Sequence, residues 1–441
     1  MPLSPADTDF LKELYANTDP NKPLEPGSPF YQPIYEGPGI EDPIAILQTK
    51  IEFAGAEGVF LLSGFRGSGK TTELFRLKQR LERAGHLVLY ADALRYVHPA
   101  QPLDIAHLLM AIGGALSDAI DGLGGFGAAP LDESYWNRLW NFLVKTDIEF
   151  KEFNALGLKL VMRDNDSFRQ RVSRALSGHI SELEREVKSF AELCGKRIRK
   201  KRPATGKIVF LFDQLEQVRG SLSEAGEVLA SVERVFAQNL HRLQLPYLHV
   251  IYTVPPWLKF VLPGTPVDVL HCVRQWNNDA QRSAHAPGNQ NLLAAIQRRF
   301  GSVERMGRFW KDVTQPERLV QVCGGHFKDL LKLVQETIAR VGASGRLPAG
   351  DDTVASAILA VRTSFLPVAL DDALWLAEVS ETRRCALRSP SHENVGRLTR
   401  LIDTHLVLYL RNGEEWYDVH PLVLPDVLEI AAAGRQRDQP Q

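Results

Sequence analysis

The hydrophobic and polar positions of the chain fall into short apolar runs separated by amphipathic stretches. The apolar run Val59–Leu62 leads into a glycine-rich loop and a helix at Thr72–Ala84, and a second strand is expected at His86–Ala91. The apolar runs Ile208–Phe212 and Leu248–Val254 predict two further strands. This order of strand, loop, helix and strand predicts a parallel sheet with helices on its faces.

The N-terminal third also contains helical and extended stretches. The first 41 residues are rich in Pro and Gly and predict an extended lead-in after one short helix at Asp9–Tyr15. Helices are expected at about Asp42–Phe53 and at Ile105–Ile120. The segment at about 132–202 predicts an inserted helical arm, because apolar residues recur there at steps of three and four. The residues expected on this one helix face are Phe168, Val172, Leu176, Ile180, Leu183, Val187 and Phe190.

The last third of the chain predicts helices and a hairpin in place of further strands of the parallel sheet. Helices are predicted at Glu317–Cys323 and His326–Val341, separated by the helix-stopping pair Gly324–Gly325. A helix at Glu393–Thr404 is followed by two β-favouring runs around Asn412–Gly413, which is a strong hairpin signal. Helices followed by a hairpin are the order of a winged helix.

Composition narrows the class of protein. The chain has 441 residues, 44% hydrophobic and 24% charged, which is enough for a sizeable core in two or three domains. A net charge of −1 gives the whole molecule no reason to coat nucleic acid or an anionic membrane. Four scattered cysteines and twelve histidines show no metal-type spacing. Without a secretory signal or an apolar run of about 20 residues, we expect a soluble cytoplasmic protein with no membrane partner.

One motif carries specific chemistry. The segment Gly64–Thr71 reads GFRGSGKT and matches G-x-x-x-x-G-K-[ST] at every fixed position. Its main-chain N–H groups can turn towards phosphate oxygens, Lys70 adds a positive charge, and the Thr71 hydroxyl can ligate Mg²⁺. Because the loop follows an apolar strand and opens a helix, it predicts a nucleoside triphosphate site, most simply for Mg-ATP. The residues expected to bind the nucleotide here are Gly64, Arg66, Gly67, Ser68, Gly69, Lys70, Thr71 and Thr72.

A carboxylate for the metal is expected at the end of a neighbouring strand. Asp213 follows the apolar run Ile208–Phe212 and is predicted to hold Mg²⁺ together with Thr71, although a strand-end acid can also simply cap a turn. Glu216 is the nearest candidate for polarising the attacking water. A pairing of Glu216 with Arg219 is the alternative.

Two further residues and a basic run have open interpretations. Thr253 ends a strand and could orient water or sense loss of phosphate, although strand propensity alone would explain it. Lys328 lies in the first turn of a helix, where a cation is disfavoured unless an anion is near; a solvated surface lysine is the alternative. A basic run could contact a nucleic acid backbone, but a charged helix end is the commoner explanation. This run comprises Lys196, Arg197, Arg199, Lys200, Lys201, Arg202 and Lys207.

These motifs together resemble those of the STAND-type and origin-recognition-like branches of the AAA+ P-loop ATPases, loosely from about Asp42 to Glu429. The resemblance is carried by GFRGSGKTTEL, FLFDQLEQVRG, CGGHFKDLLKL and WYDVHPLV. It implies an α/β P-loop NTPase sheet with an inserted helical arm, a helical lid and a C-terminal winged helix. The implied segments are a lead-in at 1–41, the ATPase core at 42–265, the lid at 266–345, the winged helix at 346–432 and a disordered tail at 433–441.

The resemblance also implies roles for single residues. Gly64–Thr71 would be the Walker A loop and Asp213 the Walker B aspartate. Thr253 would be sensor 1 and Lys328 sensor 2, and the segment around 35–46 would border the adenine. Many relatives have a glutamate directly after the Walker B aspartate, where this chain has Gln214.

The nearest acid after that position is Glu216, so hydrolysis is expected to be slow, as suits a switch. No arginine finger can be assigned, since nothing distinguishes Arg234 from Arg242. The leading hypothesis is an ATPase that acts as a Mg-ATP-dependent switch, engages a partner protein and oligomerises on binding ATP. A role in bacterial signalling or defence is an analogy from the family.

The alternative is a DNA-associated ATPase that grips duplex DNA with its winged helix and basic run. The presumed recognition helix carries only Arg397 and Arg400 as cations, near His392, which weakens this alternative. A small-molecule kinase is disfavoured by the lid and the winged helix.

Overall fold

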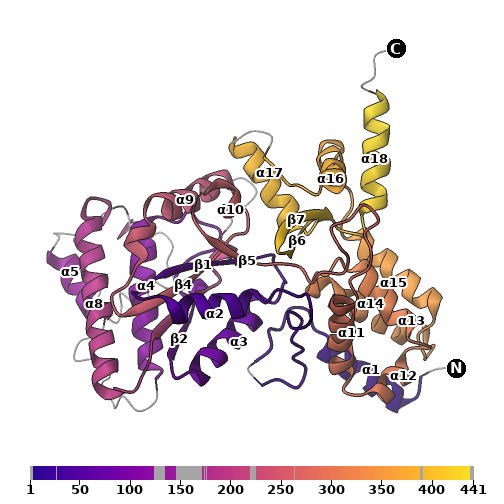
Figure 1. Cartoon of the computed structure of the whole chain (residues 1–441), viewed down its shortest axis with the longest axis horizontal. Helices are drawn as coiled ribbons and strands as arrows, with labels where there is room; N and C mark the ends of the chain where they lie inside the picture. The colour runs from indigo at the N-terminus through magenta and orange to yellow at the C-terminus, as the bar shows by residue number, and fades with distance from the viewer. Residues whose placement is uncertain are drawn as a thin grey trace.

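The structure is a computed structural model, and it describes residues 3–25, 27–123, 135–145, 171–172, 174, 176–218, 225–262, 264–387 and 391–437. An α/β core forms one half of the molecule, and helices of the last third form the other (Figure 1). The N-terminal helix packs against this second half, although the residues it contacts are far from it in the sequence. No helix in the described ranges is long and apolar enough to cross a membrane.

Five strands form the central sheet. They are β1 (Val59–Gly64), β2 (Leu87–Asp92), β3 (Ile208–Asp213), β4 (Leu248–Val254) and β5 (Val267–Leu270). Their order is β2-β3-β4-β1-β5, and every neighbouring pair is parallel. The four strands expected from the apolar runs are confirmed, with ends shifted by at most two residues. The sequence pattern does not predict β5, because this edge strand is only four residues long and half of it is partly exposed.

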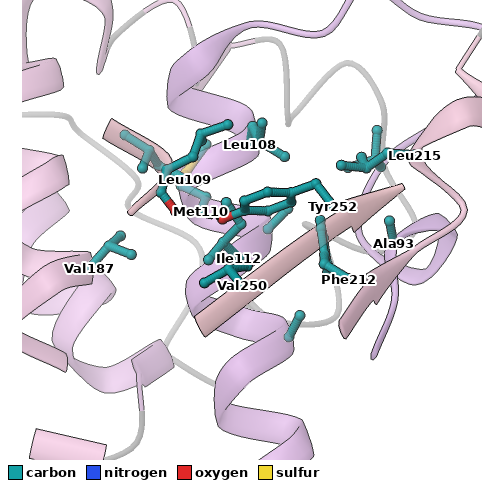
Figure 2. Close-up of a cluster of buried hydrophobic side chains, with 14 of the residues drawn as sticks. Ala93, Leu108, Leu109, Met110, Ile112, Val187, Phe212, Leu215, Val250 and Tyr252 are labelled. Atoms are coloured by element: carbon teal, nitrogen blue, oxygen red, sulfur yellow. Dashed lines mark hydrogen bonds between the residues drawn. The ribbon is translucent and has the colours of Figure 1, made fainter. Parts of the chain in front are cut away.

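Both faces of the sheet are covered, which explains why its strands read as continuous apolar runs. Helices α2 (Pro43–Phe53) and α3 (Lys70–Arg83) pack on one face, against Leu62, Val209 and Ile251. Helix α4 (Ile105–Asp121) packs on the other face. Figure 2 shows Leu108, Met110 and Ile112 of α4 beside Phe212, Val250 and Tyr252 of the sheet.

The helical arm forms an outer layer over α4. Helix α8 (Ile180–Lys201) packs along α4, so α4 is buried between the sheet and α8 and is apolar on nearly all sides. The single continuous helix face expected from residue 168 is wrong, because a 3₁₀ turn at Ser177–His179 precedes α8. Leu183, Val187 and Phe190 do form a buried face of α8, whereas Phe168 lies outside the described residues.

The other elements of the core half are short or peripheral. They are α5 (Tyr135–Lys145), α9 (Ala225–Gln238), α10 (Leu258–Val261) and the 3₁₀ turns η1 (Ala93–Arg95), η3 (Leu215–Gln217) and η4 (Leu240–Leu243). Helix α9 packs against a helix of the C-terminal region, which links the two halves on the α4 side of the sheet.

Five helices form a layer that we call the lid, and the N-terminal helix packs on it; the fifth packs on the third and fourth, although residues from 346 onward were expected in the winged helix. Its members are α11 (Ala286–Phe300), α12 (Val303–Phe309), α13 (Thr314–Val322), α14 (Phe327–Ser344) and α15 (Asp351–Thr363), and α1 (Pro5–Asn17) packs on α14 and α11. The predicted helices are confirmed, and α1 is longer than Asp9–Tyr15 because it starts earlier. The Ser4 hydroxyl accepts the Asp7 N–H and Asp7 accepts the Ser4 N–H, a capping box that fixes this start.

The winged helix follows the lid. It contains α16 (Leu370–Thr382), α17 (His392–Asp403), the antiparallel strands β6 (Val407–Asn412) and β7 (Glu414–Val419), and α18 (Leu424–Arg437). The hairpin predicted at Asn412–Gly413 is confirmed. Helix α18 continues to Arg437, so it runs into the stretch expected as a disordered tail, and residues 438–441 lie outside the described ranges. The fold class expected from the sequence is confirmed.

Candidate functional site

The glycine-rich loop connects β1 to α3 at the carboxyl end of the sheet. Helix α3 begins at Lys70, directly after Gly69, whose φ of +85° is left-handed. Gly67 also has a left-handed φ, +87°, and a Cβ there would lie 2.5 Å from Cδ and 2.6 Å from Cβ of Lys328. Glycine at position 67 therefore satisfies both the backbone and the close approach of the lid.

The loop lysine and threonine lie against two acids from the end of β3. The Lys70 Nζ donates to the Gly64 carbonyl at 3.1 Å and lies 3.0 Å from Oε1 of Glu216. The Thr71 hydroxyl donates to Oδ2 of Asp213 at 2.9 Å. Hydroxyl and carboxylate oxygens are ligands that Mg²⁺ prefers, so this pair fits the metal of a nucleotide.

Asp213 is fully buried at the centre of this group. Its Oδ2 also accepts from the Tyr90 hydroxyl at 3.1 Å, and its Oδ1 accepts from the Gln214 N–H at 2.8 Å. Burial, together with the charge of Glu216, raises the pKa of Asp213 to about 6, against the opposing effect of Lys70. A divalent cation would favour the charged carboxylate in this place.

The structure shows which residues Glu216 and Thr253 contact, which the sequence could not predict. Glu216 pairs with Lys70, and the alternative partner Arg219 lies outside the described residues. Thr253 is buried, and its hydroxyl accepts the Leu215 N–H at 3.2 Å. Thr253 therefore anchors the turn that carries Glu216 and is not among the residues that line the cavity described next.

A cavity of about 420 Å³ opens over the loop. Its walls come from the glycine loop, from residues 20–34 of the lead-in and from the lid. The hydroxyl of Ser68 faces this region, is buried, and has no hydrogen-bond partner among the described residues. An unpartnered buried hydroxyl in a glycine loop fits a phosphate oxygen.

The lead-in closes one side of the cavity. The Leu24 N–H donates to the Thr72 hydroxyl at 3.1 Å, and the Tyr31 hydroxyl donates to Glu73 at 3.1 Å. The segment expected to border the adenine was 35–46, whereas the lead-in residues lining the cavity lie between 20 and 34. Only the Pro- and Gly-rich composition marks that stretch in the sequence, and it gives no sign of a binding role.

Lys328 closes the opposite side. Its main-chain N–H donates to the Gly67 carbonyl at 3.2 Å, and its Nζ donates to Asn21 at 2.7 Å. Burial, and then the charge of Arg66, lowers the pKa of Lys328. Lys328 and the exposed Arg66 both line the cavity, so the structure brings both of these predicted residues to the loop.

Arg299 is a cavity residue that the sequence did not reveal. It lies on α11 with 4% exposure and has no ion pair with a carboxylate among the described residues. Its guanidinium carbon is 5.9 Å from the ring centre of Phe30 and 5.8 Å from that of Phe327. Burial lowers the pKa of Arg299 to about 10. Nothing in the sequence separates it from its neighbour Arg298.

The basic run and the presumed recognition helix are partly engaged within the chain. The Lys207 Nζ donates to the carbonyl of Ile51 at 2.7 Å, so this lysine ties β3 to α2 and does not belong to a surface run. On α17, Nε of Arg397 is 2.6 Å and NH2 of Arg400 is 2.7 Å from the carboxylate of Asp372. These pairs reduce the positive charge that α17 offers to a phosphate backbone.

The comparisons with known proteins give fold likenesses only. No protein-family model matches the chain, and no curated protein matches it significantly. The ORC2 protein of Aeropyrum pernix, in ADPNP–ADP complexes, is 12% identical over 89% of this chain and 93% of its own, with a TM-score of 0.36. Drosophila ORC bound to DNA is 11% identical over 98% and 93%, with a TM-score of 0.41. A Walker-type ATPase of Pyrococcus abyssi is 14% identical over 88% and 94%, with a TM-score of 0.39.

The parallel sheet and the glycine loop at the end of β1 define a P-loop nucleotide-binding fold. At these identities and with TM-scores below 0.5, the similarities to the ORC structures carry no argument about the class or activity of this chain. The STAND branch of the resemblance stays a prediction.

Proposed function

We propose that this chain is a cytoplasmic, Mg-ATP-dependent regulatory ATPase that switches conformation with its bound nucleotide. The observation that carries the proposal is the hydrogen bond between the Thr71 hydroxyl and Asp213, beside a glycine loop in which the Ser68 hydroxyl has no partner in the described part of the chain. ATP supplies the phosphates for the loop, and Mg²⁺ would be held by Thr71 and Asp213. In P-loop enzymes that hydrolyse a triphosphate, a Ser or Thr of the loop and a strand-end Asp hold the Mg²⁺ in this way.

Lys70 and Glu216 give the site two states. In the structure, Oε1 of Glu216 lies 3.0 Å from Nζ of Lys70, so the two charges neutralise each other. The β- and γ-phosphates offer Lys70 a stronger counter-charge, so binding releases the Glu216 carboxylate. Glu216 can then orient and polarise a water for attack on the γ-phosphate. Because this acid is freed only after binding, and because Gln214 follows Asp213, slow turnover is expected.

The lid supplies the mechanical link. Lys328 contacts the glycine loop through its main-chain N–H and its side chain, so a phosphate in the loop changes the surroundings of α14. The lid in turn packs on the winged helix. Movement of these parts would expose or hide a surface for a partner protein, and oligomerisation on ATP binding belongs to the same proposal. A place in bacterial signalling or defence rests on the family analogy alone.

Nucleotide binding is tested with Lys70→Ala. We expect this variant to lose binding of a fluorescent ATP analogue in the presence of Mg²⁺ while it keeps its fold by circular dichroism. Lys78→Ala is the matched control, because Lys78 lies on the same helix and forms a more exposed pair with Glu82. Unchanged ATP affinity in Lys70→Ala would remove the loop from the mechanism.

The partner is tested with Glu216→Gln, which is expected to bind ATP without hydrolysing it. Affinity capture of this trapped variant, against Lys70→Ala as the empty control, separates ATP-dependent partners from background. A protein retained only by the trapped variant supports the switch. Retention of DNA instead, lost as salt is raised, would support the DNA-associated alternative.

One group of exposed basic residues favours the alternative of a DNA-associated ATPase. The C-terminal end of α8 exposes Arg199, Lys200 and Lys201 on one side of the core. We expect Lys200→Ala/Lys201→Ala to leave nucleotide binding intact, and any DNA binding that depends on this end should weaken in the double variant. The pairing of Arg397 and Arg400 with Asp372 makes the winged helix the weaker candidate surface.

A further inference from the structure

Three buried side chains with metal-binding atoms meet where the lid contacts the winged helix. His326 caps the start of α14, Asp329 lies in its first turn, and His405 lies between α17 and β6. His326 Nδ1 is 2.7 Å and His405 Nδ1 is 2.8 Å from the same oxygen, Oδ2 of Asp329. The three ligand atoms all lie within 4.8 Å of one another. None of the three residues lines the nucleotide cavity.

His326 brings a ring nitrogen close to a carboxylate oxygen at this point. His326 Nε2 is 3.0 Å from the Arg66 carbonyl oxygen, which can only accept, so Nε2 carries a proton. In a neutral ring, Nδ1 then has a lone pair that faces a carboxylate oxygen at 2.7 Å. Two lone pairs at that distance repel. Either a second proton or a metal ion must lie between them.

The two imidazoles are arranged as ligands that share one ion. The ring centres of His326 and His405 are 3.8 Å apart, and both Nδ1 atoms point to the same carboxylate oxygen. A proton on each Nδ1 would let both histidines donate to Asp329, so the metal is proposed on the grouping of three buried ligand atoms and not on the protonation of His326. A metal ion uses both nitrogen lone pairs and the carboxylate at once.

Two of the three residues, Asp329 and His326, have the kind of second contact that orients metal ligands. The Lys332 Nζ holds the other oxygen of Asp329 at 2.8 Å, and the Arg66 carbonyl holds the far nitrogen of His326. His420 is not a ligand. Its Nδ1 accepts the Leu422 N–H at 3.2 Å, so its Nε2 carries the proton and faces Asp329 Oδ2 at 3.6 Å.

We propose that His326, Asp329 and His405 form a binding site for one zinc-class divalent cation. Neutral imidazole and carboxylate suit Zn²⁺ among the common metals. His405 also lines a second cavity, of about 560 Å³, from which water can supply the fourth ligand. The ligands come from two parts of the chain, which is why no motif in the sequence announces the site. The proposal does not depend on nucleotide binding.

The test is direct metal binding by the full chain, prepared with chelator and then freed of it. Titration with Zn²⁺ against a chromophoric chelator should show one site with a dissociation constant below about 1 μM. Co²⁺ in place of zinc should give the intense visible absorption of a four-coordinate site. His405→Gln keeps a polar side chain of similar size and should weaken zinc binding by at least about tenfold. His241→Gln removes an exposed histidine and should change nothing.

The magnesium site is separated by Asp213→Asn, which should leave zinc affinity unchanged. The proposal is overturned if the wild-type chain binds no zinc, if His405→Gln binds it as tightly as wild type, or if Asp213→Asn abolishes binding. Should His405→Gln misfold by circular dichroism, the cobalt spectrum of the wild-type protein decides alone. An octahedral spectrum, or none, would then reject the site.

Discussion

The buried pair of Lys70 and Glu216 allows a sharp prediction for Glu216→Gln. The two side chains are 5% and 9% exposed, and their charged atoms are 3.0 Å apart. Glutamine has nearly the same shape and can still accept a hydrogen bond from Lys70, but it removes the negative charge. In the nucleotide-free protein, Lys70 then loses this close ion pair and keeps Asp213 as the other negative charge near it.

The magnitude follows from two known costs. Removing one partner of a buried ion pair costs about 3–5 kcal/mol, because the other charge stays buried. A retained hydrogen bond to a charged group recovers about 1.5–3 kcal/mol. We therefore expect Glu216→Gln to lower the stability of the nucleotide-free protein by about 2 kcal/mol.

The same loss should appear as a gain in nucleotide affinity. In the wild type, phosphate must displace Glu216 from Lys70, whereas in the variant no charge competes. If all of the cost of about 2 kcal/mol were returned on binding, ATP would bind about 30-fold more tightly. Hydrolysis should fall in the same variant, since the water-polarising carboxylate is gone.

Thermal unfolding with and without Mg-ATP, together with ATP titration, measures both effects. The nucleotide-free midpoint should fall by about 2–4 °C, and saturating Mg-ATP should restore most of the loss. Glu82→Gln on the surface of α3 is the control and should stay within about 0.5 kcal/mol of wild type. An unchanged midpoint in Glu216→Gln, or weaker ATP binding, would refute the idea that Glu216 neutralises Lys70 in the empty site.

Three further outcomes are expected. Burial raises the pKa of Asp213 to about 6, so below that pH a proton competes with Mg²⁺ for the carboxylate. The affinity for Mg-ATP should therefore fall from pH 7 to pH 5. An affinity that does not change with pH in Mg²⁺ titrations would contradict this. Arg299→Met removes a buried cation that has no acidic partner among the described residues, so it should raise the thermal midpoint of the nucleotide-free protein while weakening ATP binding, and a lowered midpoint would argue against this view. Gly67→Ala places a Cβ 2.5 Å from Lys328 at a left-handed φ, so it should abolish binding of the fluorescent ATP analogue; wild-type affinity would mean that the lid yields easily.

The parts of the fold predicted well are those that repeat a local pattern. The strands at β1, β3 and β4 are apolar runs because both faces of the sheet are covered, and that signal is in the sequence itself. The hairpin at Asn412–Gly413 was equally clear, because its turn needs a residue that tolerates a left-handed φ. The edge strand β5 was missed because it has only four residues, two of them partly exposed, which is too short to show a periodicity.

The same distinction between local patterns and long-range contacts applies to the residues of the functional site. The spacing within Gly64–Thr71 is local, so it could be recognised, and the end of β3 pointed to Asp213. The partner of Glu216 and the anchoring role of Thr253 depend on contacts between distant segments. Arg299 could not have been found, because its position in the cavity depends on how α11 docks against the lead-in.

The first turn of α14 explains why these long-range contacts matter together. Its main-chain N–H at Lys328 and the ring of His326 reach the carbonyls of Gly67 and Arg66, two neighbouring residues of the phosphate loop. The next residue, Asp329, points to the winged helix through His405. If the loop moves when phosphate binds, it therefore pulls on α14 at two points. The movement then either reaches the winged helix through Asp329 and His405 or breaks one of these hydrogen bonds. A cation bound by His326, Asp329 and His405 would favour movement of the winged helix, because it strengthens the contact between α14 and His405.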